Sequence, residues 1–334
     1  MTGRRSIIAG LAASMAGWMV RAQAPGRRYR IGYLGYTAAN TPDHEPAWGA
    51  FVQRLRELGF SEGVNLRIEQ RFAEGVNERY TEFAAELVRL GADLVVATSG
   101  TAARAVMAAS RSMPVVITAA PADPVRAGLV ASLAHPGGQV TGFTNLSGDL
   151  VPKRLELLKV AVPSARRIAF TRCPSCEKTS GVSAAEAVAL LEGHAAAARS
   201  LGMTLVPVEL NAASDFDTAS AVVLRERCDA LLIGSSPVNR ALQGRWRAFA
   251  AAQRLLTMAP SRGYGALLSY GPDYVAVHRR AAELVARILN GANPGDLPME
   301  QPTKFELVVN LRIARAIGLV IPQSLLLRAD EVIE

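Results

Sequence analysis

The stretch DLVVATSGT, residues 93–101, decides the fold of this chain. Its unbroken apolar run predicts a strand over 93–98 that is buried on both faces of a sheet, since a strand with one solvated face alternates polar and apolar residues. A helix is predicted to follow over 101–110, and the next strand over 114–119. Strand, helix and strand in this order indicate a parallel α/β sheet.

The same alternation continues on both sides of that stretch. Before and after it, strands are expected at 31–36, 65–72 and 139–144, and helices at 46–58 and, capped by Asn77, up to residue 90. After a helix at 151–160 capped by Asp149, a second series has strands at 167–171, 204–210, 230–235 and 256–259, with helices at 183–201, 215–227 and 240–253. The fold class predicted is therefore α/β, with two doubly wound parallel-sheet lobes.

The C-terminal part of the chain has too few elements for a third domain. Strands are expected at 266–270 and 304–310, and helices at 274–289 and 311–317. We expect these elements to complete both lobes, so that 29–144 with about 272–292 form the N-terminal lobe and 145–271 with about 300–334 form the C-terminal lobe. The chain then crosses between the lobes more than once, which predicts a multi-crossover hinge.

The first 24 residues are typical of an export signal peptide. Arg4 and Arg5 precede an apolar run, and the small residues Ala22 and Ala24 follow it. The run is too short to span a bilayer of about 30 Å as a helix. We expect cleavage after Ala22, by the secretory or the twin-arginine route, and a periplasmic mature protein.

Composition limits the possible functions. The chain has 334 residues, 50% hydrophobic and 6% aromatic, and a formal net charge of +8. Three of those positive charges, Arg4, Arg5 and Arg21, leave with the signal, so the mature chain carries about +5. Its basic residues are scattered along helices without interleaved aromatics, which argues against nucleic acid as a partner.

Cys173-Pro-Ser-Cys176 has the spacing of a redox or half-zinc motif, but the chain has no second pair, and Cys228 stands alone. In an oxidising compartment a local disulfide between Cys173 and Cys176 is favoured over redox chemistry. We expect no metal and no cofactor.

Ligands of open parallel sheets bind beyond the carboxyl ends of the strands, so the residues that follow each predicted strand are the candidates. These ligand-binding candidates are Tyr36, Thr37, Thr98, Ser99, Gly100, Thr101, Asp123, Arg172, Ser235, Ser236 and Arg262. Residues 98–101 start a helix, whose free N–H groups and hydroxyls suit a carboxylate or phosphate; the alternative is that Ser99 or Thr101 only caps the helix.

The other candidates also keep two interpretations. Asp123 suits a ligand amino group but also a turn before Pro124. Tyr36 stacks on a ligand or packs at the lobe rim. Arg172 and Arg262 reach a ligand carboxylate across the cleft or remain solvated.

The motifs of the common enzyme classes do not occur in this sequence. The histidines, 44, 135, 194 and 278, are widely spaced, and the sequence contains no HExxH, GxSxG, GxxxxGK[ST] or GxGxxG. We therefore expect a protein that is not an enzyme, although a triad assembled from distant residues would leave no such signature.

Phrases along the whole chain carry a family resemblance. They are RIGYL (30–34), ATSGT (97–101), DPV (123–125), GLVASL (128–133), HPGGQVTG (135–142), KRLELL (153–158), LSYGP (268–272), QPTKFELVVN (301–310) and ADEVIE (329–334). In these phrases the chain resembles the periplasmic substrate-binding components of ABC transporters, in particular the tryptophan and tyrosine binders. It departs from them at 172–176, where relatives have an Asn-Pro-rich loop.

The resemblance implies a type I periplasmic binding protein fold that crosses three times between its lobes. It also implies a receptor that closes on a small molecule, possibly an aromatic or other amino acid, and delivers it to an ABC permease in the inner membrane. A monomer suffices for that task. Two alternatives stay open: an exported enzyme on the same fold, or the ligand-sensing subunit of a signalling system.

Overall fold

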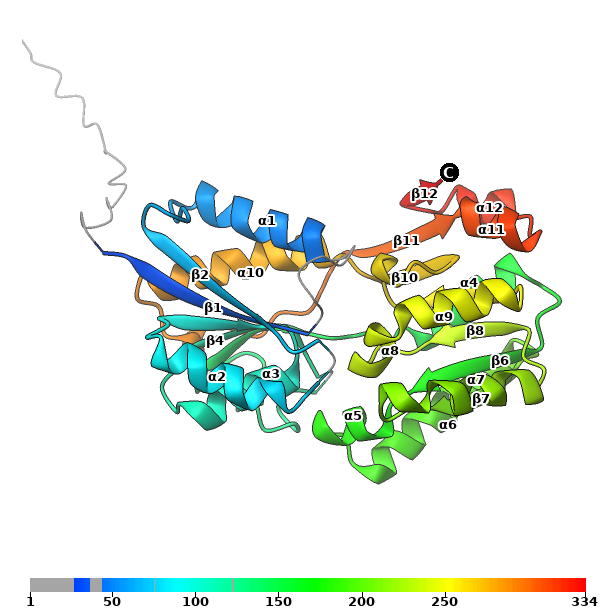
Figure 1. The fold of residues 1–334 in the computed structure, drawn as a ribbon, viewed down its shortest axis with the longest axis horizontal. Helices are drawn as coiled ribbons and strands as arrows, with labels where there is room; N and C mark the ends of the chain where they lie inside the picture. Colours follow the sequence, from blue (N-terminus) through cyan, green and yellow to red (C-terminus); the bar gives the residue numbers. More distant parts are fainter. Residues whose placement is uncertain (1–26, 37–43, 75, 122) are drawn as a thin grey trace, which may run out of the picture.

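The computed structural model describes residues 27–36, 44–74, 76–121 and 123–334. The predicted signal peptide, 1–24, and the candidate Thr37 lie outside these residues. Figure 1 shows two α/β lobes side by side, each built on its own sheet. The predicted fold class is confirmed.

The sheet of the N-terminal lobe has five strands in the order β2-β1-β3-β4-β5, all parallel. They are β1 Tyr29–Gly35, β2 Leu66–Phe72, β3 Leu94–Ala97, β4 Val115–Ala120 and β5 Val140–Thr144. All four residues of β3 are buried, as its apolar run predicts. The helices α1 His44–Glu57 and α10 Tyr274–Leu289 cover one face of the sheet, and α2 Arg79–Arg89 and α3 Gly100–Ala109 cover the other.

The sheet of the C-terminal lobe has seven strands in the order β12-β11-β10-β9-β8-β6-β7. They are β6 Arg167–Arg172, β7 Thr204–Glu209, β8 Ala230–Ile233, β9 Leu256–Ala259, β10 Leu268–Pro272, β11 Phe305–Asn310 and β12 Glu331–Ile333. On one face pack α4 Val151–Ala161, α6 Ala184–Ser200, α11 Leu311–Ile317 and α12 Gln323–Leu326. The other face carries α5 Pro174–Thr179, α7 Phe216–Arg225, α8 Pro237–Ala241 and α9 Gln243–Ala252. Short 3-10 turns lie at Ala213–Asp215, Arg262–Tyr264 and Pro294–Asp296.

Three connections join the lobes, between β5 and α4, between β10 and α10, and between α10 and β11. Asp273, in the second connection, accepts hydrogen bonds from Ala276 N at 3.0 Å and from Lys304 Nζ, in the third connection, at 2.8 Å. Burial raises the pKa of the Asp273 carboxyl, but Lys304 and the N–H donors outweigh burial and hold that pKa below its ordinary value. The second and third connections are therefore joined by a partly buried ion pair.

Arg154 joins the first connection to the C-terminal lobe. Its side chain is 1% exposed and donates to the Tyr270 carbonyl at 2.7 Å, to the Ser147 carbonyl at 2.7 Å and to the Ser147 hydroxyl at 3.0 Å. Burial lowers the pKa of this guanidinium to about 10. Because a buried donor is costly unless it is bonded, these contacts fix the start of the hinge relative to the end of β10.

Some details of the sequence prediction are wrong. β11 runs antiparallel to β10, because the third connection brings the chain back into the sheet from the opposite end. The helix predicted over 240–253 is two helices: α8 begins earlier, at Pro237 with Ser236 as its N-cap, and ends at Ala241, and α9 begins at Gln243.

Two predicted helix caps are also wrong. The N-cap positions of α2 and α4 are Glu78 and Leu150, not Asn77 and Asp149. Both have right-handed helical backbone angles and make no side-chain cap, so the chain enters each helix through a turn.

Candidate functional site

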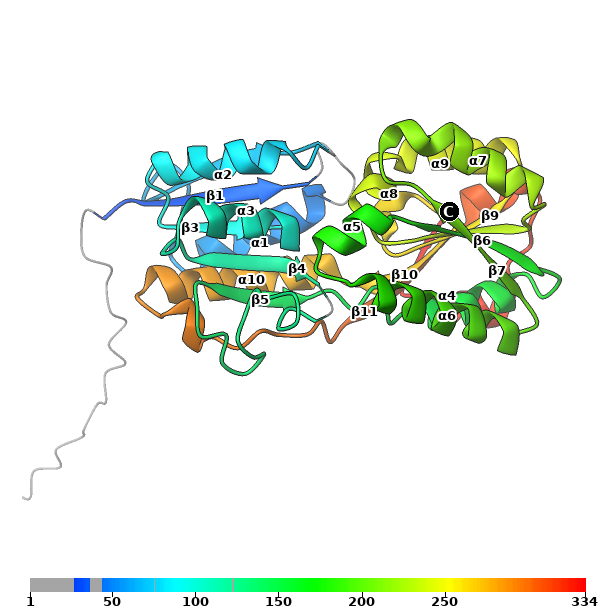
Figure 2. The same ribbon diagram turned by 90° about the horizontal axis from the view of Figure 1, so that it is seen from below.

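A cavity of about 260 Å³ lies between the two lobes. Its N-terminal wall comes from the ends of β1, β2, β3 and β4, and its C-terminal wall from the segments after β8 and β9. Figure 2, turned by 90° from Figure 1, shows that the strands β1 and β4 of one sheet and β6 of the other run along the axis that joins the lobes. The residues that line the cavity are Tyr33, Gly35, Tyr36, Ala47, Phe72, Thr98, Ser99, Gly100, Thr101, Thr118, Ala119, Ala120, Pro121, Asn145, Ser180, Ser235, Ser236, Pro237, Arg240, Pro260, Ser261, Tyr264, Tyr274 and His278.

The loop after β3 supplies hydrogen-bond donors to this cavity. Ser99 is the N-cap of α3: its hydroxyl accepts from Ala102 N at 3.2 Å, and its carbonyl accepts from Ala103 N at 3.0 Å. Within the described part of the chain, the N–H groups of Gly100 and Thr101 have no acceptor. The cap and the open donors therefore occur together, so that the two interpretations of this stretch are not exclusive.

Glycine is required at position 100. A Cβ atom there would lie 2.9 Å from Cδ of Pro121 in the loop after β4. The two loops therefore pack directly against each other, and the start of α3 lies close to the carboxyl end of β4.

Tyr36 follows β1 and is 9% exposed. Its hydroxyl has no hydrogen-bond partner among the described residues. Burial, and next the nearby rings of Tyr80 and Tyr264, raise the pKa of this phenol far above its ordinary value. The hydroxyl therefore stays protonated and keeps a proton to donate.

The C-terminal wall also presents hydroxyl groups to the cavity. Ser235 is exposed, and Ser236 is partly buried and caps α8 by accepting from Asn239 N at 3.1 Å. The guanidinium of Arg240 lies over the ring of Tyr264, 5.0 Å from its centroid. This wall thus presents hydroxyls and one cation stacked on an aromatic ring.

Seven candidates from the sequence line the cavity: Tyr36, Thr98, Ser99, Gly100, Thr101, Ser235 and Ser236. Asp123, Arg172 and Arg262 are not among its lining residues. Each of these three has an ionic partner in its own neighbourhood: Arg126 for Asp123, Glu177 and Glu209 for Arg172, and Glu331 for Arg262.

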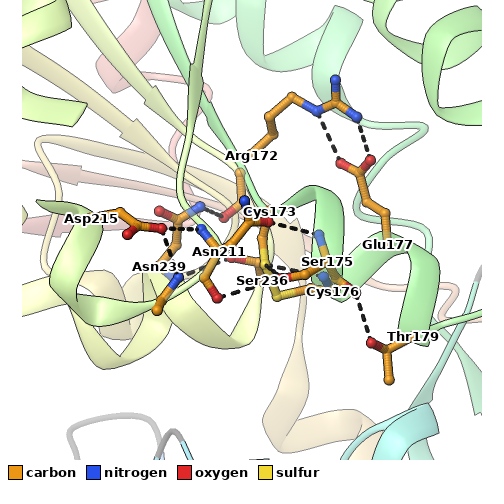
Figure 3. Close-up of a disulfide and its surroundings, with 12 residues drawn as sticks. Arg172, Cys173, Ser175, Cys176, Glu177, Thr179, Asn211, Asp215, Ser236 and Asn239 are labelled. Atoms are coloured by element: carbon orange, nitrogen blue, oxygen red, sulfur yellow. Dashed lines mark hydrogen bonds and ion pairs between the residues drawn. A yellow bond between two sulfur atoms is a disulfide. The ribbon is translucent and has the colours of Figure 1, made fainter. Parts of the chain in front are cut away.

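The segment after β6 contains the short helix α5. Cys173 and Cys176 form a disulfide, with their Cα atoms 5.2 Å apart (Figure 3). Ser175 N donates to Asn211 Oδ1 at 2.9 Å, and Arg172 donates from Nη2 to Glu177. Polar groups here bind one another. Among the described residues, no cluster of His, Cys, Asp or Glu has the arrangement of a metal site.

Cys228, the third cysteine, is buried, and burial raises the pKa of its thiol to about 11. It is therefore a protonated, unreactive side chain at neutral pH.

Apart from Tyr36, sequence reasoning missed the aromatic part of the lining. Tyr33, Phe72, Tyr264 and Tyr274 come from four separate elements, together with His278, whose Nδ1 lies 2.8 Å from the Tyr274 carbonyl. Tyr264 lies three residues after Ser261, beyond β9, so a wider search around the strand ends would have found it. Tyr274 and His278 lie one turn apart on α10, which no rule about strand ends reaches.

The comparisons with known proteins agree with this geometry. Residues 42–333 match the family model described as ABC transporter substrate binding protein. The chain belongs to this family. Within the described residues, no helix of this substrate-binding protein is long and apolar enough to cross a membrane.

Its relatives include a tyrosine-binding protein of Clostridioides difficile (strain R20291), 27% identical over 287 residues, which are 83% of this chain and 78% of the relative. A conserved domain protein from Vibrio cholerae is similar in structure, with a TM-score of 0.78, 27% identity, and coverage of 92% of this chain and all of the other. A Streptococcus pneumoniae ABC domain in complex with L-Trp has the same fold, with a TM-score of 0.77, 23% identity, and the same coverage. These structures have the type I periplasmic binding protein fold.

Proposed function

We propose that this substrate-binding protein is an extracytoplasmic receptor that captures a small molecule between its lobes and delivers it to an ABC permease in the inner membrane. One observation carries the proposal: the cavity is lined from both lobes, at the ends of strands that three connections hold together. A ligand that contacts both walls stabilises the closed arrangement, and a permease can distinguish closed from open lobes.

The aromatic lining supports a ligand with an aromatic or other flat apolar body. The relatives named above as a tyrosine-binding protein and as a complex with L-Trp favour aromatic amino acids or compounds of similar shape. A cavity of about 260 Å³ is slightly smaller than most ligand pockets, which span about 300 to 1,000 Å³, so a small ligand is favoured.

The proposal includes export. Residues 1–24 have the charge, apolar core and small residues of a signal peptide, and removing them places the mature protein in the periplasm. The receptor acts as a monomer and performs no catalysis.

A thermal-shift screen tests the function. The mature protein, from Gln23, is screened against amino acids, small carboxylates, purines and sugars, and the compound that gives a shift is recovered and checked for chemical change. A receptor predicts a rise of several degrees with one ligand class and an unaltered compound. Conversion of the compound contradicts the proposal and identifies an exported enzyme.

A matched pair of variants ties the shift to the cavity. Thr101→Val removes a lining hydroxyl, whereas Thr179→Val removes an exposed hydroxyl on α5 outside the lining. We expect the ligand-induced shift to shrink in the first variant and to persist in the second. Equal shifts in both would place the ligand elsewhere.

A further inference from the structure

The cavity offers donors for an anion on its N-terminal wall. Gly100 and Thr101 are the first two residues of the ten-residue helix α3, and their N–H groups have no acceptor among the described residues. The helix dipole favours negative charge at this end. A carboxylate fits both features.

A second, independent feature points to the same ligand group. Tyr36 is one of the residues that line the cavity, and its hydroxyl is buried and has no partner in the described part of the chain. An unbonded buried hydroxyl costs free energy, so it gains by donating to an acceptor that a ligand brings. An anionic oxygen is the strongest such acceptor.

The cavity offers little to a cation. Its described lining residues include no aspartate and no glutamate. The charged or basic side chains among them are those of Arg240 and His278. From the sequence, Asp123 is the acid that best suits a ligand amino group, but it is not among the lining residues. Its side chain is half exposed, and Oδ1 accepts a hydrogen bond from Arg126 N at 2.9 Å. A desolvated ammonium without a carboxylate is unfavourable.

We infer that the preferred ligand of this cavity is an aromatic carboxylate with no ammonium group beside the carboxylate, rather than an amino acid. The inference rests on the proposed receptor function and specifies its ligand class. The carboxylate binds at the start of α3 and at Tyr36, and the ring lies among the aromatic side chains of the lining.

Matched compounds test the inference by isothermal titration calorimetry on the mature protein. The pairs are 3-(4-hydroxyphenyl)propionate with L-tyrosine, 3-phenylpropionate with L-phenylalanine, and indole-3-propionate with L-tryptophan. The members of each pair differ by the ammonium group alone. We expect the propionate of at least one pair to bind tenfold or more tightly than its amino acid, and the corresponding arylethylamine not to bind.

A variant should reverse this order. Ser236 lies on the C-terminal wall, and aspartate serves as an N-cap as well as serine does, so Ser236→Asp adds a carboxylate and keeps the start of α8. We expect the preference for the propionate to fall several-fold in Ser236→Asp. It should change little in Ser183→Asp, the control, which adds a carboxylate at the N-cap of α6 outside the lining.

The outcomes separate the inference from the proposed function. Tighter binding of an amino acid than of its propionate overturns the inference and leaves the receptor in place. Binding of none of these compounds also overturns it, and the thermal-shift panel then judges the function by itself.

Discussion

Two segments of this protein follow parallel strands at the ends that face the interlobe region, yet they do opposite things. The loop after β3 starts a helix with N–H groups that have no acceptor among the described residues, and its residues line the cavity. The segment after β6 also starts a helix, but Ser175 N is bonded to Asn211, and Arg172 is paired with Glu177. The first segment is available to a ligand, and the second is occupied by its own neighbours.

The difference shows that position at a strand end does not make a binding residue. A charged or polar group there binds a ligand only if the fold leaves it without a closer partner. Arg172 has two carboxylates within 4 Å, whereas the backbone N–H of Thr101 has no hydrogen-bond acceptor among the described residues.

The largest expected effect is that of proline at Thr101, the second residue of α3. Thr101→Pro removes an open N–H and a lining hydroxyl, while proline is tolerated in a first helical turn. We expect affinity for the tightest compound of the panel to fall about 10- to 100-fold, as for a lost hydrogen bond to a charged group of about 1.5 to 3 kcal/mol. Calorimetric titration measures the change.

Ser175→Pro is the matched control, since Ser175 holds the same position in α5. Its N–H already has a partner, so this variant should lower the free energy of unfolding by about 1 to 3 kcal/mol and leave affinity within about threefold. Equal losses of affinity in both variants would break the comparison.

The disulfide gives the next largest effect, on stability alone. Cys173 and Cys176 close a loop with a sequence separation of only 3, for which chain entropy predicts about 2 kcal/mol. Double substitution to serine should lower the free energy of unfolding by about that amount, as measured in urea. A tenfold change in ligand affinity would show that the segment after β6 contributes to binding.

Tyr36→Phe should weaken ligand binding about tenfold, because the hydroxyl donates to the ligand anion. The melting temperature of the free protein should stay the same or rise, since the removed hydroxyl has no partner in the described chain. Tyr270→Phe, outside the lining, is the control. A large loss of stability in Tyr36→Phe would mean that this hydroxyl already has a partner in the free protein.

The smallest effect is expected where the lobes touch outside the cavity. Arg126, after β4, forms an ion pair with Glu186 of α6 in the other lobe. The Arg126 side chain is 58% exposed, so Arg126→Gln should weaken ligand binding at most about fivefold at low salt. The difference from the unaltered protein should vanish in 1 M salt, because exposed ion pairs are screened. A salt-independent difference would contradict this assignment.

The sequence predicted the two sheets well. The parallel strands β3, β4 and β8 are short, mainly apolar runs, and such runs are typical of strands buried on both faces of a sheet. It also predicted five of the eight serines and threonines among the described lining residues, since their place after a strand follows from topology. β11 was predicted as a strand, but its antiparallel direction was not. That direction depends on the third connection, which has no local sequence signature.

The rest of the site depends on contacts between distant residues. From the sequence, Arg172 is a candidate to bind a ligand carboxylate. In the structure its guanidinium forms ion pairs with Glu177 on α5 and with Glu209 on the neighbouring strand β7. Tyr274 and His278 reach the cavity from α10, which enters the N-terminal lobe only after the second connection. Neither fact can be read from local spacing.

Amide hydrogen exchange with and without the tightest compound of the panel tests the central claim most directly. If the ligand binds at the start of α3, the amides of Gly100 and Thr101 should exchange much more slowly in the complex, while those of 173–176 should change little. Protection of 173–176 with none at 100–101 would contradict the account and place the ligand at the segment after β6.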